Sequence, residues 1–285
     1  MMNEKFKRLI TCPAAMCKAI LVIALAYSWS IPSLAVDATK DRVLKLTIVD
    51  ADTGLMTPAR VEIVNDKGKY FLAEDALLIG GDCNVKNDGD RNYSFQKALS
   101  KFKRKVVDVS TGATQFYSTG KSEVKLPQGL YYIKVYKGVE YEVGVSEFRV
   151  QAEKEIVEHN IALKRWVNMS TKGWYSADDH IHIERPVRDL NPFVLKMMQA
   201  EDLNVANLLQ MGKADYFSIA HQYAHGHDGL HQEKEYILSS GQENPRTHIM
   251  GHAITLGAKK ALHLPQEYLI YRLLWQKAVN EGGIN

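Results

Sequence analysis

Residues 43–54 read VLKLTIVDADTG, and this stretch decides the fold of the first half of the chain. Apolar and polar residues alternate from Val43 to Val49, which is the period of a β-strand with one buried face. Turn residues then end the run. Residues 59–68 read ARVEIVNDKG, so a second alternating run also ends in a tight-turn signal. Two such runs in succession predict neighbouring β-strands.

Four more strand candidates follow before residue 165. They lie at 122–126, 130–136, 140–150 and 156–163, with PQG at 127–129 as a turn. Short strands, alternation and frequent turns predict an all-β sandwich over residues 42–165. The pattern breaks between Asp75 and Lys105, where the polar insertion at 80–90 lacks the spacing of a calcium loop. We interpret this insertion as a solvated loop.

Several short motifs of this first half resemble those of carboxypeptidase regulatory-like, transthyretin-like domains. The motifs are DTG at 52–54, PARV at 58–61, KG at 67–68 and LPQGLY at 126–131. The resemblance implies a β-sandwich that is usually an accessory module. It brings no catalytic residues.

Residues 1–35 have the three parts of a cleavable secretion signal. A basic segment precedes an uninterrupted apolar run from Ala19 to Tyr27, which is shorter than the roughly 20 residues that a bilayer core needs. Ser33-Leu34-Ala35 then offers the small residues that a signal peptidase reads. We expect an exported protein, periplasmic or extracellular, with no stable membrane span after cleavage. An uncleaved N-terminal anchor is the alternative.

Composition and charge exclude some classes of function. Hydrophobic residues make up 46% and charged residues 24% of the chain, as in a globular protein. Removal of residues 1–35 takes away four basic side chains and one acidic side chain, which lowers the net charge from +3 to zero. A neutral protein without a basic stripe gives no electrostatic reason to bind nucleic acid. Cys83 is then the one remaining thiol, interpreted as an ordinary loop cysteine rather than a reactive one.

After Lys164 strand-like and helical runs alternate, which is the pattern of an α/β domain over residues 166–285. Strands are expected at 174–183, 203–209, 236–240 and 248–256, and helices at 193–202 and 265–279. Asn191-Pro192 predicts the start of the first helix, with Asn191 as its cap. Gly282-Gly283 predicts the end of the last one.

Histidines and a carboxylate lie in or just after these strands. His180 and His182 are two residues apart, so on a strand both imidazoles can reach one ion, although two unrelated histidines are the alternative interpretation. Glu243 follows a glycine turn after the strand at 236–240, and His252 lies in the next strand. Imidazole and carboxylate are ligands for zinc, manganese or iron. The sequence therefore predicts a site for divalent metal ions, of unknown number, at His180, His182, Glu243 and His252.

The same residues lie in motifs that resemble the CehA/McbA family of PHP-type metallohydrolases. The motifs are GWYSADDHIH at 173–182, AEDLNVANLL at 200–209, GQE at 241–243 and GH at 251–252. The resemblance covers roughly Trp166 to the end of the chain. It implies a distorted β/α barrel with a cluster of divalent metals, in which His180 and His182 are the first ligands, Glu243 a bridging carboxylate and His252 a further ligand. It also implies hydrolysis of an ester, carbamate or phosphoester substrate by metal-activated water. A non-catalytic exported binding protein with a degenerate hydrolase domain is the alternative.

Two features depart from the family pattern. Gln210-Met211-Gly212 stands where such hydrolases have an Asp-His pair, which leaves the metal count open. The chain also ends at Asn285, whereas a barrel of this kind takes about 200 residues or more. We therefore expect this chain to be a C-terminally truncated fragment with an incomplete barrel.

Other polar residues of the second half are left without a firm role. His221, His225, His227 and His231 form a histidine-rich stretch, interpreted as a solvated loop or as the source of one ligand, and Asp228 and Glu233 share that uncertainty. Glu201 and Asp202 lie in a helix-to-strand corner, where a cap or surface pair is the expectation. No general acid or base is assigned.

Overall fold

The computed structural model describes residues 40–74, 76, 114–212, 214 and 217–285. The expected signal segment at 1–35, the polar insertion at 80–90 and Cys83 lie outside the described residues. Residues Val36–Asn285 belong to one compact unit. The expected division between residues 165 and 166 remains a prediction.

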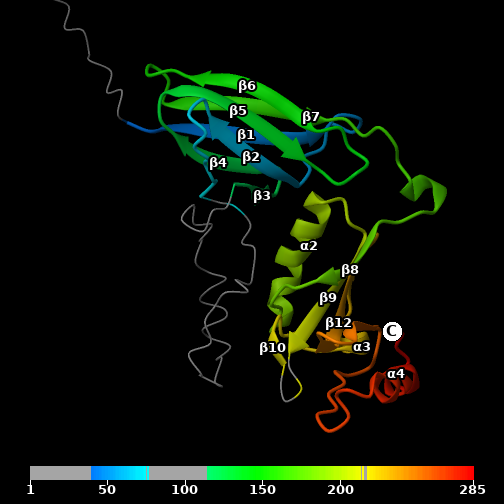
Figure 1. The fold of residues 1–285 in the computed structure, drawn as a ribbon. Helices are drawn as coiled ribbons and strands as arrows, with labels where there is room; N and C mark the ends of the chain where they lie inside the picture. The colour runs from blue at the N-terminus through cyan, green and yellow to red at the C-terminus, as the bar shows by residue number, and fades with distance from the viewer. Residues whose placement is uncertain (1–39, 75, 77–113, 213, 215–216) are drawn as a thin grey trace, which may run out of the picture. The chain divides into compact units, whose positions relative to one another are not determined.

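Two sheets form the first half of this unit (Figure 1). In the first, β1 (Arg42–Asp50) pairs antiparallel with β4 (Lys121–Leu126) and parallel with β7 (Ile156–Leu163). The second has the order β3-β2-β5-β6, and all of its neighbouring strands are antiparallel. Its strands are β3 (Phe116–Ser118), β2 (Ala59–Asn65), β5 (Gly129–Tyr136) and β6 (Gly144–Val150).

The alternation seen in the sequence places one face of each sheet in a shared core. Leu44, Leu46 and Ile48 of β1 are buried in the same cluster as Val61 and Ile63 of β2. Each fully buried aliphatic side chain of this kind contributes about 1.5–3 kcal/mol. This is the arrangement of a β-sandwich, in which the inner faces of two sheets make the core.

A third sheet follows the sandwich. Its centre consists of three parallel strands, in which β9 (Val205–Gly212) pairs with β8 (Ala177–Ile181) on one side and β12 (Tyr236–Thr247) on the other. The remaining strands are antiparallel to their neighbours: β10 (Phe217–Ile219) pairs with β9, and both β11 (His231–Glu233) and β13 (Gly251–Leu256) pair with β12.

Helices connect and flank the strands of this sheet. The helix α2 (Asn191–Ala200) joins β8 to β9 and buries Val194, Leu195 and Met198 against the sheet (Figure 1). The others are the short helices η2 (Ser170–Lys172), η3 (Arg188–Leu190) and α3 (Gly226–Gly229), and the C-terminal helix α4 (Tyr271–Asn280). Asn191 does not cap α2 as expected, because it lies inside the helix and its side chain is buried.

The expected α/β PHP-like barrel is wrong. Closure would require the outer strands of the third sheet to pair with each other, and among the described residues they do not. The reason is the direction of β13, which turns back along β12 as an antiparallel hairpin instead of adding a further parallel strand. The described fold is mostly β, with an open mixed sheet after the sandwich.

A polar network joins the sandwich to the segment between α2 and β9. The guanidinium of Arg60 lies 2.6 Å from Glu201, and the hydroxyl of Tyr117 donates to the same carboxylate at 2.8 Å. Arg165 pairs with Asp202 at 2.8 Å and also with Glu140. Glu201 and Asp202 therefore connect two parts of the compact unit instead of forming a surface pair.

Candidate metal centre

The end of β8 presents two histidines to one region of the third sheet. His180 is fixed by its backbone N–H, which donates to Asp178 Oδ1 at 2.9 Å. His182 follows the strand by one residue. The two imidazole rings lie 5.1 Å apart between centroids and nearly perpendicular, at 78°. Alternation along an extended backbone thus places both rings together, as the spacing of the pair predicts.

Glu243 of β12 supplies a buried carboxylate to these rings. Its side chain is 2% exposed. One carboxylate oxygen, Oε2, lies 2.8 Å from His182 Nε2 and 3.3 Å from His180 Nε2. Among the residues that the structure describes, these three form the one group of histidine, cysteine or acidic side chains with metal-ligand spacing, and their ligand atoms all lie within 4.8 Å of one another.

The protonation of His182 follows from its second ring nitrogen. Nδ1 lies 2.8 Å from the backbone oxygen of Leu209, and a carbonyl oxygen can only accept a hydrogen bond. Nδ1 therefore carries the proton, and in the neutral ring the lone pair of Nε2 points at Glu243. A lone pair and a carboxylate oxygen repel each other unless a proton or a cation lies between them. Metal-bound histidines commonly have this arrangement, with the other ring nitrogen donating to a carbonyl.

The other oxygen of Glu243, Oε1, has separate partners. Arg246 Nε donates to it at 3.1 Å, and His252 Nδ1 also contacts it. Arg246 lies opposite His252 in the pairing of β12 with β13, and a break in register between Glu243 and Arg246 places both side chains at the same carboxylate. His252 contacts this carboxylate but lies outside the three-residue group.

The environment of Glu243 favours its ionised form. Burial raises the pKa of this carboxyl, but the charge of Arg246 and the hydrogen bond from His180 lower it by more, so the pKa lies below its ordinary value. An ionised carboxylate is the form that binds a cation.

The distances at Oε2 approach those around a small divalent ion. Zinc binds imidazole nitrogen and carboxylate oxygen at about 2.0–2.2 Å, so two of its ligand atoms lie about 3.4 Å apart at the tetrahedral angle. The separation of 3.3 Å from His180 is close to this value and that of 2.8 Å from His182 is shorter, so binding an ion would move these side chains slightly. Histidine and carboxylate together suit zinc, manganese or iron rather than calcium.

A hollow of about 210 Å³ lies beside this group. Arg246 and His252, which both contact Glu243, also line this hollow. The described residues that line it are Gly212, Ala214, Arg246, Thr247, His248, His252 and Tyr268.

The histidine-rich stretch does not gather into a second group of this kind among the described residues. His221 contacts Glu184, with its backbone N–H 3.1 Å from one carboxylate oxygen and its ring 3.3 Å from the other. His225 is largely buried and its Nε2 has no hydrogen-bond partner among the described residues. His227 is 98% exposed, near the exposed Asp228, and His231 lies in β11 with Glu233.

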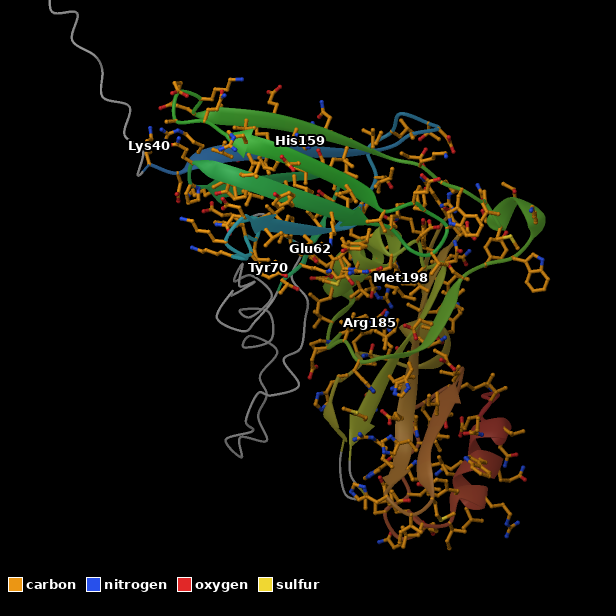
Figure 2. The ribbon with its side chains drawn as sticks, turned by 45° about the horizontal axis from the view of Figure 1, so that its top comes forward. Lys40, Glu62, Tyr70, His159, Arg185 and Met198 are labelled. Atoms are coloured by element: carbon orange, nitrogen blue, oxygen red, sulfur yellow. The ribbon has the colours of Figure 1, made fainter. Side chains whose placement is uncertain are left out.

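Two arginines of this region could not be assigned from the sequence. Arg246 is three residues after Glu243, and only the break in register of β12 shows that they touch. Arg185, labelled in Figure 2, is fully buried beside the same sheet and bonds Gln222, Asn191, Gly229 and Ser240. A short polar stretch such as IERP at 183–186 carries no signal of burial.

Comparison with known proteins gave no family and only distant structures. No protein-family description and no curated protein matches the chain. The minor pilin GBS52 of Streptococcus agalactiae has 14% identity and a TM-score of 0.28, over 46% of this chain and 47% of that one. The shaft pilin SpaA of Lactobacillus rhamnosus GG has 16% identity and a TM-score of 0.28, over 46% and 49%. The Bacillus anthracis TIE protein has 17% identity and a TM-score of 0.26, over 44% and 17%.

The chain matches less than half of the length of each of these proteins. Identities below 25% and TM-scores below 0.5 are too low to transfer a pilus role to this chain. Export of the chain stays a prediction from its sequence. Within the described residues, no helix is long and apolar enough to cross a membrane.

Several predictions of function are corrected by the fold. Among the described residues the third sheet is open, and β13 returns antiparallel along β12 instead of extending the parallel strands of a PHP barrel. The identification with the CehA/McbA family of PHP-type hydrolases is therefore wrong. The hydrolase activity, and the ester, carbamate or phosphoester substrate expected as its partner, are withdrawn with it.

Proposed function

We propose that this chain is a divalent-metal-binding protein, in which one ion held by His180, His182 and Glu243 ties the end of β8 to β12. The observation that carries the proposal is the convergence of both imidazoles on one buried carboxylate oxygen. The ion's role in this proposal is to fix strands and to bind a partner. The proposed location is outside the cytoplasm, in the periplasm or the extracellular space.

The energetics of Glu243 support an ion in this place. A buried carboxylate is costly unless it is paired, and Oε2 faces the Nε2 atoms of His180 and His182. A cation that takes the place of protons shared between these three side chains would pair with the carboxylate and both ring nitrogens at once. Arg246 already neutralises Oε1, which leaves Oε2 as the oxygen for the ion.

Zinc binding measured by competition with a chromophoric chelator tests the proposal. The wild-type protein is expected to take up zinc, and His182→Ala is expected to weaken that binding at least about tenfold, since loss of a ligand or of its supporting contacts reduces affinity by about 10–100-fold. Manganese and ferrous iron are compared in the same assay.

A matched control is available in the histidine-rich stretch. The side chain of His227 is almost fully exposed and lies near Asp228. His227→Ala removes one histidine without touching Glu243, so it is expected to bind zinc like the wild type. Equal zinc binding by the wild type, His182→Ala and His180→Ala would contradict the proposal, because the ion would then be held elsewhere.

A further inference from the structure

The hollow beside the proposed ion has a positive lining. Arg246 contributes a full positive charge, and His248 and His252 contribute imidazole rings. None of the described residues that line it is acidic. The hollow therefore suits a negatively charged group, and its volume of about 210 Å³ is that of a side chain rather than of a large ligand.

The guanidinium of Arg246 has hydrogen-bonding capacity left over. Its Nε donates to Glu243, and its two terminal nitrogens make no hydrogen bond to any described residue. Arginine donates in a fork that matches the two oxygens of a carboxylate. Arg246 can thus hold Glu243 with one nitrogen and a second carboxylate with the others.

The charge balance at the proposed metal site also favours binding of a negatively charged group. A divalent ion and Arg246 together bring three positive charges, against one negative charge on Glu243, the single carboxylate of the three-residue group. Two positive charges then remain beside the hollow. An incoming carboxylate would reduce this excess.

Exposed apolar residues follow directly in sequence two of the residues that line the hollow, which favours a polypeptide over a small ion. Ile249 and Met250, in the turn between β12 and β13, are 96% and 55% exposed, and Leu269, next to Tyr268, is 66% exposed. Isolated small anions gain nothing from such side chains, whereas apolar neighbours of an acidic residue would be buried against them.

The turn that carries Ile249 and Met250 is held in place by hydrogen bonds. The Met250 backbone N–H donates to Thr247 Oγ1 at 3.0 Å. Tyr271 donates its hydroxyl proton to the Gly251 oxygen at 2.5 Å, so its contact of 3.0 Å with Thr247 is accepted from the threonine. A turn fixed before binding loses little conformational entropy when a partner arrives.

We infer that this hollow binds an acidic side chain of a partner polypeptide, with the carboxylate held by the terminal nitrogens of Arg246 and with apolar neighbours against Ile249 and Leu269. This inference rests on the proposed metal site. It adds the class of partner, an acidic residue flanked by apolar residues, and it makes Arg246 the residue that recognises the partner's charge.

Two labelled peptides, one with a glutamate between two leucines and one with a glutamine in its place, test the inference by fluorescence anisotropy on the full chain. With zinc present, the wild type is expected to bind the glutamate peptide at least about tenfold more tightly, the difference that about 1.4 kcal/mol produces. A chelator is expected to reduce this preference.

Arg246→Gln, tested at a zinc concentration that saturates its own metal site, is expected to abolish the preference for glutamate. Arg149→Gln, an exposed arginine of β6, is the matched control and is expected to keep the preference. Ile249→Ser is expected to weaken the binding of both peptides equally, because it removes an apolar contact and no charge. These variants distinguish the contribution of the partner's charge to binding from the contribution of its apolar residues.

The outcomes distinguish this inference from the proposed function. A protein that binds zinc but treats both peptides equally, or an Arg246→Gln variant that keeps the full preference, would overturn the inference alone. A wild type that binds no zinc would overturn the proposed metal site, and the inference with it. Displacement of the glutamate peptide by acetate as readily as by unlabelled peptide would assign the hollow to small carboxylates and also overturn the inference.

Discussion

Lys137 is a charged side chain in an apolar position. It is 4% exposed, and its ammonium donates to the backbone oxygens of Pro58, at 3.0 Å, and Gln199. Burial lowers the pKa of Lys137 from 10.5 to about 8, although the charge of Asp202 opposes part of this change. The folded protein therefore releases a proton that the unfolded chain retains between these two values.

This difference gives a prediction for alkaline pH. Because the unfolded chain binds more protons between pH 8 and pH 10.5, the contribution of Lys137 to the free energy of unfolding rises with pH across this window. Urea unfolding of the wild type and of Lys137→Met at several pH values measures it. The stability of the wild type relative to the variant should increase from pH 8 upwards. A difference independent of pH would contradict the lowered pKa.

The buried His225 gives a prediction for stability at acidic pH. Burial, with the charge of Arg185 as a second cause, lowers the pKa of His225 from 6.5 to about 4. The unfolded chain then binds more protons between pH 4 and pH 6.5, so this residue lowers stability progressively as the pH falls through that window. His225→Leu should lose stability less steeply than the wild type between these values in the same urea experiment. His227→Leu, at an exposed position, should retain the wild-type slope.

At the scale of elements, Arg185 organises the connection that passes over the third sheet. Its guanidinium donates to the backbone oxygen of Gly229 at 2.8 Å and to Ser240 Oγ of β12 at 2.5 Å. It also donates to Gln222 at 3.0 Å and to Asn191 at the start of α2 at 3.1 Å. One buried side chain thus links β12, α2 and the segment from Gln222 to Gly229.

Replacing Arg185 by methionine should destabilise the protein strongly. Several buried acceptors would lose their donor at once, and each unsatisfied group costs about 1–3 kcal/mol, so we expect a loss of about 3 kcal/mol or more in urea unfolding. Hydrogen exchange should accelerate over residues 221–230. Arg188→Met, at an exposed position in η3, is the control. A loss below about 1 kcal/mol for Arg185→Met would contradict the role of this network.

The elements themselves were largely predictable from the sequence. The alternating runs at 43–49, 59–64 and 130–136 correspond to β1, β2 and β5, because a period of two is a local property of the chain. The run at 193–202 likewise corresponds to α2. Their pairing was not predictable: the antiparallel return of β13 depends on contacts with β12 that no local pattern encodes. The inference of a barrel failed at this step.

The candidate site was also only partly predictable from the sequence. The spacing of His180 and His182 predicts neighbouring rings because both lie on one extended segment. Glu243 was proposed as their partner from its place after a strand, and the structure places it against both rings. Arg246 was missed, because its contact with Glu243 depends on the break in register between them. Whether a metal ion binds there remains the prediction tested by zinc competition.

At the scale of the whole molecule, the network around Glu201 couples the sandwich to the third sheet. Arg60 and Glu201 are each about 30% exposed in their side chains, so their ion pair is partly screened by water. A double-mutant cycle with Arg60→Met and Glu201→Gln is expected to give a coupling free energy of about 1 kcal/mol. The well-exposed pair of Lys164 and Glu142 should give a smaller coupling free energy. Equal coupling in both pairs would contradict a special role for Glu201.

Cooperativity of unfolding is a second property at this scale. Residues Val36–Asn285 form one compact unit, so calorimetry of the wild type should show a single transition. Arg60→Met combined with Arg165→Met removes the ion pairs with Glu201 and Asp202, and it is expected to separate this transition into two. Two transitions in the wild type would contradict the coupling.

The outer strands of the third sheet have a consequence for its behaviour in concentrated solution. One border is divided between β8 and β10, of five and three residues, and the other between β11 and β13, of three and six residues. Long, flat, unpaired borders are the templates on which foreign strands grow into aggregates. Here each border is divided between two short strands, and the border of β8 and β10 also changes direction part-way, so an approaching strand finds only a short partner. We expect this division to disfavour lateral growth of the sheet into fibrils.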